Sequence, residues 1–230
     1  MLSEFFENGQ NHHCLHILCK NPCDEALDLV LQNPHMIEWD LLSSNTNPRA
    51  VALLLQNPDR INWMRFSANS CDAAVEYILA PENRDNIRWG AFCENTHDRA
   101  VDVVLQNPLK LVNFSLSKNS NPRVVEFLFQ NPMHMMDLPL CTNPNDRVVE
   151  ALLQNRQAWN WVGFSRNPND RIVDMLLDPT RVGREWADLC TNRSDRIIDF
   201  LEENRDCIVW ESLCLNDNPR LWHTSEFPIK

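Results

Sequence analysis

Glycine is scarce in this sequence, with 4 residues against 14 prolines in a chain of 230. Helix ends and turns must therefore be made mainly by proline and asparagine. Four glycines leave no glycine-rich loop that could hold a phosphate, and the seven histidines do not recur at a fixed position. No grouping of serine, histidine and aspartate typical of a hydrolase can be inferred. The sequence predicts a protein that is not an enzyme and that carries no cofactor.

Long apolar segments are missing as well. No apolar run reaches the roughly 18 residues of a membrane span, and the start, MLSEFFENGQ, lacks the basic and apolar regions of a signal peptide. A formal charge of -11 disfavours nucleic acid as a partner, because binding to phosphates needs a basic face. We therefore expect a soluble cytoplasmic protein with no membrane segment.

What the sequence does contain is a repeated phrase: Leu or Phe, then Ser or Cys, any residue, and Asn. It occurs nine times at spacings of 24 to 26 residues and ends at Asn21, Asn45, Asn69, Asn95, Asn119, Asn143, Asn167, Asn192 and Asn216. Self-similarity at a fixed period predicts a stacked-repeat solenoid. We expect an N-terminal capping helix over residues 1–12, the repeat solenoid over 13–222 and a C-terminal tail over 223–230.

The repeat over residues 45–69 indicates how each layer folds. Asn47 is suited to cap a helix and Pro48 to open it, since a proline needs no partner at the first helical position. Pro58 then ends the helix by disfavouring α conformation in the residue before it. Residues 61–67 are too short for a strand pair and are predicted to form a 3₁₀ turn. The expected fold is all-α, with about nine 24-residue repeats, each a short α-helix plus a short 3₁₀ turn, stacked into a rod or arc on the order of 80 Å long.

Two segments resemble leucine-rich-variant repeats, in which one short α-helix alternates with one 3₁₀ turn: NPNDRVVEALLQN (143–155) and NPNDRIVDMLLDP (167–179). The likeness covers nearly the whole chain, although the recurring tryptophan is a feature of its own. The resemblance implies a right-handed solenoid and no particular activity. The arrays are also similar to NP-rich repeat proteins of large DNA viruses of algae and amoebae, which would place a viral chain in the host cytoplasm or the virion.

The chain has nine cysteines, an odd number that fits poorly with a closed set of disulfides. Five of them occupy the position that serine holds in the other repeats, which indicates a small buried side chain and a reducing compartment. Near the N-terminus, histidines and cysteines have the chemistry of zinc ligands but not the usual spacing. We expect a capping layer there, with a metal site as the alternative, formed by His12, His13, Cys14, His16, Cys19 and Cys23.

Two kinds of repeated side chain are predicted to be structural. The asparagine of the phrase is expected to bond to backbone in a tight turn. Tryptophan recurs at one position in six of the nine repeats and is expected to form a hydrophobic spine, at Trp39, Trp63, Trp89, Trp161, Trp186 and Trp210. Asn113 and Asp137 hold the tryptophan position in the two middle repeats. A partner-binding notch is therefore predicted there, with His134 beside it.

An arginine also recurs, three residues before a carboxylate, as expected for ion pairs along a helix surface. These arginines are the alternative partner-binding residues, as a ladder facing an acidic protein: Arg99, Arg123, Arg147, Arg171 and Arg196.

Three functions follow from a long repeated surface. The first is a non-catalytic scaffold that binds a protein partner, because a solenoid offers variable exposed positions between fixed core positions. The second is a structural component of a larger assembly such as a viral particle. The third, recognition of single-stranded nucleic acid by one base per repeat, is disfavoured by the charge.

Overall fold

The computed structural model describes residues 15–181 and 183–221, and all regular structure within them is helical. The predicted capping helix and tail both lie outside these residues. The longer helices are α3 (Asp24–Gln32), α5 (Pro48–Leu55), α7 (Asp72–Leu79), α9 (Asp98–Leu105), α11 (Pro122–Gln130), α13 (Asp146–Gln154), α15 (Asp170–Leu177) and α17 (Asp195–Glu203).

Short helices alternate with these: α2 (Leu15–Leu18), α4 (Trp39–Leu42), α6 (Trp63–Phe66), α8 (Trp89–Phe92), α10 (Asn113–Lys118), α12 (Asp137–Leu140), α14 (Trp161–Ser165), α16 (Trp186–Leu189) and α18 (Trp210–Leu213). Between a longer helix and the next short one lies a 3₁₀ turn in most repeats: η2 (Pro34–Met36), η3 (Pro58–Arg60), η4 (Pro81–Asn86), η5 (Pro108–Lys110), η6 (Pro132–His134), η7 (Arg156–Ala158) and η8 (Arg205–Cys207), with η9 (Pro219–Leu221) after α18.

The helix ends follow the expected local chemistry. The Asn47 side chain accepts a hydrogen bond from the Arg49 amide at 2.9 Å, and Pro48 is the first residue of α5. The helix ends at Leu55, ahead of Pro58, because the residue before a proline avoids α conformation. The predicted cap, start and stop of this helix are confirmed.

The second half of the repeat differs from the prediction. The 3₁₀ turn lies at Pro58–Arg60 instead of residues 61–67, and Trp63–Phe66 form a single α-helical turn. Proline opens the 3₁₀ turn for the same reason that it opens a helix, since its missing donor would be unpaired there. The Asn62 side chain then accepts from the amides of Met64 and Arg65, which starts a new α turn. Each of these repeats therefore has three short helical pieces.

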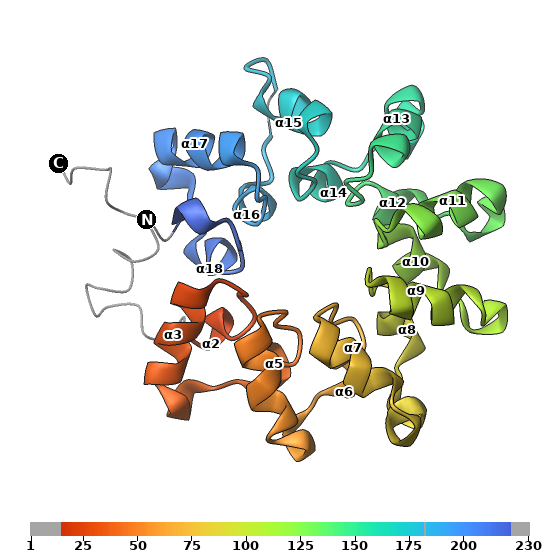
Figure 1. The fold of residues 1–230 in the computed structure, drawn as a ribbon. Helices are drawn as coiled ribbons and strands as arrows, with labels where there is room; N and C mark the ends of the chain where they lie inside the picture. The colour runs from red at the N-terminus through yellow and green to blue at the C-terminus, as the bar shows by residue number, and fades with distance from the viewer. Residues whose placement is uncertain (1–14, 182, 222–230) are drawn as a thin grey trace.

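The repeats close into a ring, whereas a rod or arc was expected. Figure 1 shows α3 and α2 of the first repeat beside α18 of the last. The Asn21 side chain donates to the carbonyls of Cys214 and Asn216, both at 2.9 Å, across more than 190 residues of sequence. A small rotation between consecutive layers adds up to a full turn over the nine repeats.

The core runs through every layer as a continuous band of buried side chains. The Leu or Phe of the repeated phrase lies at its centre, and Phe66, Phe92 and Phe164 have no exposed surface. The longer helices add three buried apolar residues each, such as Ala50, Val51 and Leu54 in α5. Helices of eight or nine residues are too short to be stable alone, so burial against both neighbouring layers stabilises them.

Tight packing between layers gives a first prediction. A Cβ added at Gly163 would lie 2.7 Å from Cβ of Cys141 in the preceding repeat, whereas one added at Gly90 would meet nothing within 4 Å. We expect Gly163→Ala to lower the free energy of unfolding by about 1–3 kcal/mol through overpacking. Gly90→Ala should cause no loss, because alanine favours a helix over glycine. Urea denaturation of both variants tests this, and equal stabilities would contradict it.

Candidate functional site

A closed ladder of buried asparagines joins all nine repeats. In each layer Nδ2 donates to two carbonyls of the preceding layer, as Asn95 does to Ser67 at 3.1 Å and Asn69 at 2.8 Å. Its Oδ1 accepts from the amide two residues on, that of His97, at 3.0 Å. The same pattern holds at every asparagine of the phrase. Because these side chains are fully occupied and buried, their structural role is confirmed, and they also link neighbouring repeats.

The serine or cysteine of the phrase has a related role. Ser43 accepts from the amide of Asn62 in the next repeat at 3.0 Å, and Cys19 accepts from that of Glu38 at 3.3 Å. Both atoms are small acceptors in buried positions, which explains their exchange. Burial raises the pKa of the thiols in this position, namely Cys19, Cys93, Cys141 and Cys190. They are therefore poor nucleophiles.

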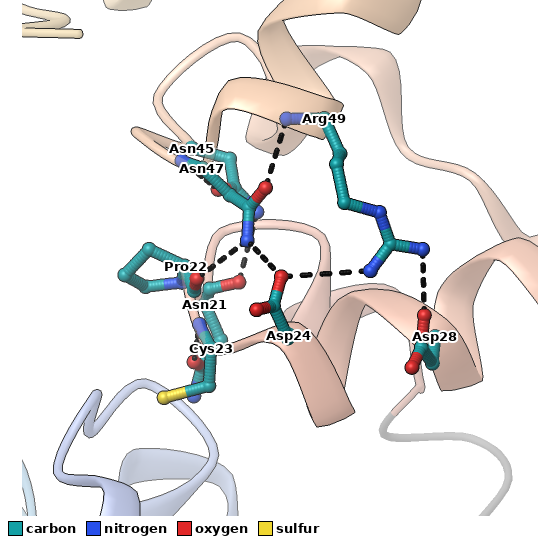
Figure 2. A network of polar contacts seen from close by, with 8 residues as sticks. All are labelled: Asn21, Pro22, Cys23, Asp24, Asp28, Asn45, Asn47 and Arg49. Atoms are coloured by element: carbon teal, nitrogen blue, oxygen red, sulfur yellow. Dashed lines mark hydrogen bonds and ion pairs between the residues drawn. The ribbon is translucent and has the colours of Figure 1, made fainter.

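A second, exposed ladder is shown in Figure 2. Asn47 donates to the Pro22 carbonyl and to Asp24, both at 2.9 Å, and Arg49 reaches Asp28 at 2.7 Å. Four of the five arginines named from the sequence make the same contact with the preceding repeat. Their partners are Asp102 for Arg123, Glu126 for Arg147, Glu150 for Arg171 and Asp174 for Arg196.

The predicted pairing of these arginines within one helix is therefore wrong. A repeat of 24 residues places an arginine 3 residues before one carboxylate and 21 after another, and the second partner lies across the layer boundary. Arg99 has no ion pair within the described residues and lines a surface hollow with Trp89 and Lys110. The paired arginines join layers, so little of the ladder is free for a partner.

The tryptophans are half-buried and pack against the core without forming its centre. The row of tryptophans that was expected to form a hydrophobic spine therefore lies at the edge of the core. Trp63 stacks on Tyr77 of the next helix with ring centroids 6.1 Å apart, and Trp186 stacks on Phe200 in the same way at 5.7 Å. The phenylalanines and leucines of the phrase take the central position because it has no access to solvent.

A cavity of about 160 Å³ lies where one tryptophan is missing. Asp137 takes the position of Trp63, and Ala151 of α13 takes that of Tyr77, so both members of the stacked pair are absent from this layer. The walls are mainly apolar and include Phe129, Met135 and Leu152. The structure thus places Asp137 at an open, mainly apolar pocket.

In the layer of Asn113, polar contacts take the place of the tryptophan. His134 Nδ1 lies 2.8 Å from Asn113 Oδ1, and the His134 ring lies 5.5 Å from that of Phe127. Asn113 and His134 are therefore brought together from consecutive repeats.

Exposed apolar residues gather on these two layers. Six of the ten large exposed hydrophobic residues in the described chain lie between residues 109 and 138, and we call them the middle patch: Leu109, Val112, Phe114, Met133, Met136 and Leu138. Leu109 is 99% exposed and Met133 81%. Sequence reasoning missed Leu109 and Met133, although the repeat held a signal, because the residue at their position is polar in other layers, at His35, Asp59, Gln157 and Asp206.

The metal candidates are only partly described. His12, His13 and Cys14 lie outside the described residues, and no group of three or more possible ligands occurs among the rest. Cys19 is a core residue of the repeated phrase, and the Cys23 thiol donates to the Asp217 carbonyl at 3.2 Å. Burial, with Asp217, Glu25 and Asp24 nearby, raises the pKa of Cys23 to about 11. A protonated thiol is a poor metal ligand.

Comparison with known proteins gives no match to any protein family, curated protein or solved structure. Within the described residues, no helix has the length and apolar character needed to cross a bilayer.

Proposed function

We propose that this chain is a non-catalytic scaffold that binds a protein partner through the middle patch and the cavity at Asp137. The observation that carries the proposal is the coincidence of both features in the two middle layers, where Asn113 and Asp137 hold the tryptophan position. Monomeric surfaces rarely gather exposed apolar residues in one area unless they contact something. The methionines in the patch suit an adaptable interface, since their side chains are flexible and polarisable.

The cavity also suggests what the partner presents. Two other layers, those of Trp63 and Trp186, fill the equivalent space with a stacked aromatic pair, and the lining here is apolar, with Phe129, Met135 and Leu152. An aromatic side chain of the partner would replace the missing ring and bury its surface there. Such aromatic residues in pockets are typical anchors of protein interfaces.

We infer further that the ring is a right-handed solenoid, as the resemblance to leucine-rich-variant repeats implies. A role as a structural component of a larger assembly has less support. An elongated component would polymerise through its end layers, and here the first and last repeats bond to each other. Single-stranded nucleic acid remains disfavoured by the charge of -11.

Charge placed on the middle patch should abolish capture of the partner. We expect Leu138→Glu to reduce recovery of a stoichiometric protein from the native host at least tenfold, because a buried carboxylate without a partner is costly. Asp137→Trp should do the same by filling the cavity from within. Affinity capture with quantitative mass spectrometry measures both.

Met64→Glu is the matched control, since Met64 is 58% exposed but lies in a repeat that keeps its tryptophan. A protein retained by Met64→Glu and lost by the two other variants supports the proposal. Unchanged capture by Leu138→Glu and Asp137→Trp would contradict it.

A further inference from the structure

A cavity of about 710 Å³ lies inside the ring, and residues of all nine repeats line it. They come from the positions just before and just after the buried asparagine of the phrase. Seven of the sixteen lining residues are serines or threonines, whose hydroxyls can donate or accept hydrogen bonds. The charged members are Lys20, Lys118, Arg166, Arg193 and Asp217. Closure of the ring thus creates a polar space that an open stack would not have.

The charge of this space is opposite in sign to that of the chain, which is -11 overall. Three of the four cations have a carboxylate partner: Lys118 with Glu94 at 3.0 Å, Arg166 with Asp188 at 2.6 Å, and Arg193 with Asp217 at 3.3 Å. Lys20 has no carboxylate within ion-pair distance among the described residues. The four cations of the lining and their three carboxylate partners, of which only Asp217 itself lines the cavity, therefore leave one positive charge uncompensated.

The surroundings of Lys20 are positive. Lys20 is exposed to the cavity, yet partial loss of solvent around it lowers the pKa of its ammonium group, and repulsion from Arg65, Arg166 and Lys118 adds to this effect, against the attraction of Glu94. Cations held close together inside low-dielectric walls produce a field that concentrates anions. An anion beside Lys20 would offset that repulsion.

We propose that the axial cavity binds a compact oxyanion of the phosphate type, with Lys20 as its main contact. A phosphate group has acceptor oxygens on every side, which suits hydroxyl donors that arrive from all around a ring. Lys118 and Arg166 keep donors that their carboxylate partners do not use, and charge-assisted hydrogen bonds to phosphate are the stronger kind. The site is separate from the middle patch, so it does not depend on protein binding.

Isothermal titration calorimetry with pyrophosphate and with inorganic phosphate tests this site at low ionic strength. We expect one pyrophosphate per chain, bound more tightly than phosphate and weakened by added NaCl because of screening. Lys20→Gln should weaken binding at least tenfold, and Lys20→Arg should preserve it. Arg205→Gln is the control, since it removes the same charge from an exposed position in η8 outside the cavity.

Thr46→Glu provides a second variant that leaves Lys20 in place. Thr46 is exposed to the cavity, and a carboxylate there should oppose an anion and reduce binding as strongly as Lys20→Gln. Thermal denaturation and circular dichroism confirm that the variants fold. The proposal fails if neither anion binds the wild-type chain. It also fails if Arg205→Gln weakens binding as much as Lys20→Gln, since that would indicate general charge attraction.

Discussion

Asn95→Ala should lower the free energy of unfolding by about 3 kcal/mol or more. The substitution removes three hydrogen bonds of a side chain with no exposed surface. It leaves two buried carbonyls and one amide without their partner, and each unsatisfied group costs about 1–3 kcal/mol. Urea denaturation followed by tryptophan fluorescence measures the loss.

Asn107→Ala is the matched control for this ladder. Asn107 is half-buried and donates to the Val103 carbonyl at 2.7 Å, within its own repeat. Water can replace that bond, so a loss of only about 1 kcal/mol is expected. A loss at Asn95 no larger than that at Asn107 would show that contacts between layers do not depend on the asparagine ladder.

Asn21→Ala should destabilise the protein as much as Asn95→Ala if the ring is closed. Asn21 donates to the Cys214 and Asn216 carbonyls at the junction of the first and last repeats. In an open stack the same side chain would donate to water, and its loss would cost little. Comparison of the two variants under identical denaturing conditions therefore separates a ring from an open stack.

A disulfide crosslink tests directly whether the first and last repeats lie next to each other. The Cys23 thiol lies 3.2 Å from the Asp217 carbonyl, so Asp217→Cys places two thiols at the junction. Mild oxidation should yield an intramolecular disulfide, visible as faster migration on a non-reducing gel. Closing a loop of 194 residues should raise the free energy of unfolding by about 5 kcal/mol. Asp217→Ser controls for loss of the carboxylate, and dimers as the main oxidised product would argue against closure.

Features set by neighbouring residues could be predicted from the sequence. The cap at Asn47, the start at Pro48 and the stop before Pro58 depend on the conformational limits of those residues alone. The missing tryptophan at Asp137 could also be predicted, because comparison of the repeats shows which side chain a layer lacks. The 3₁₀ turn was misplaced since proline can open either kind of helix, and only the hydrogen bonds of the folded turn distinguish them.

The carboxylate partner of each arginine could not be predicted from the sequence. In a repeated sequence each arginine has two equally regular carboxylate partners, one in its own helix and one in the preceding repeat. The choice depends on how far apart two layers lie and how they rotate, which packing of side chains such as Phe66 and Phe92 determines. Sequence spacing alone does not contain that distance.

The sequence by itself determined that this protein is a regular all-α repeat, because caps, stops and apolar periodicity act within a few residues. It also located the irregular middle layers. Only the tertiary structure decided that the repeats form a ring, since the rotation between layers is a property of their packed interfaces and accumulates over the whole chain. That closure joins Asn21 to Asn216 and gathers Lys20, Lys118 and Arg166 around one cavity.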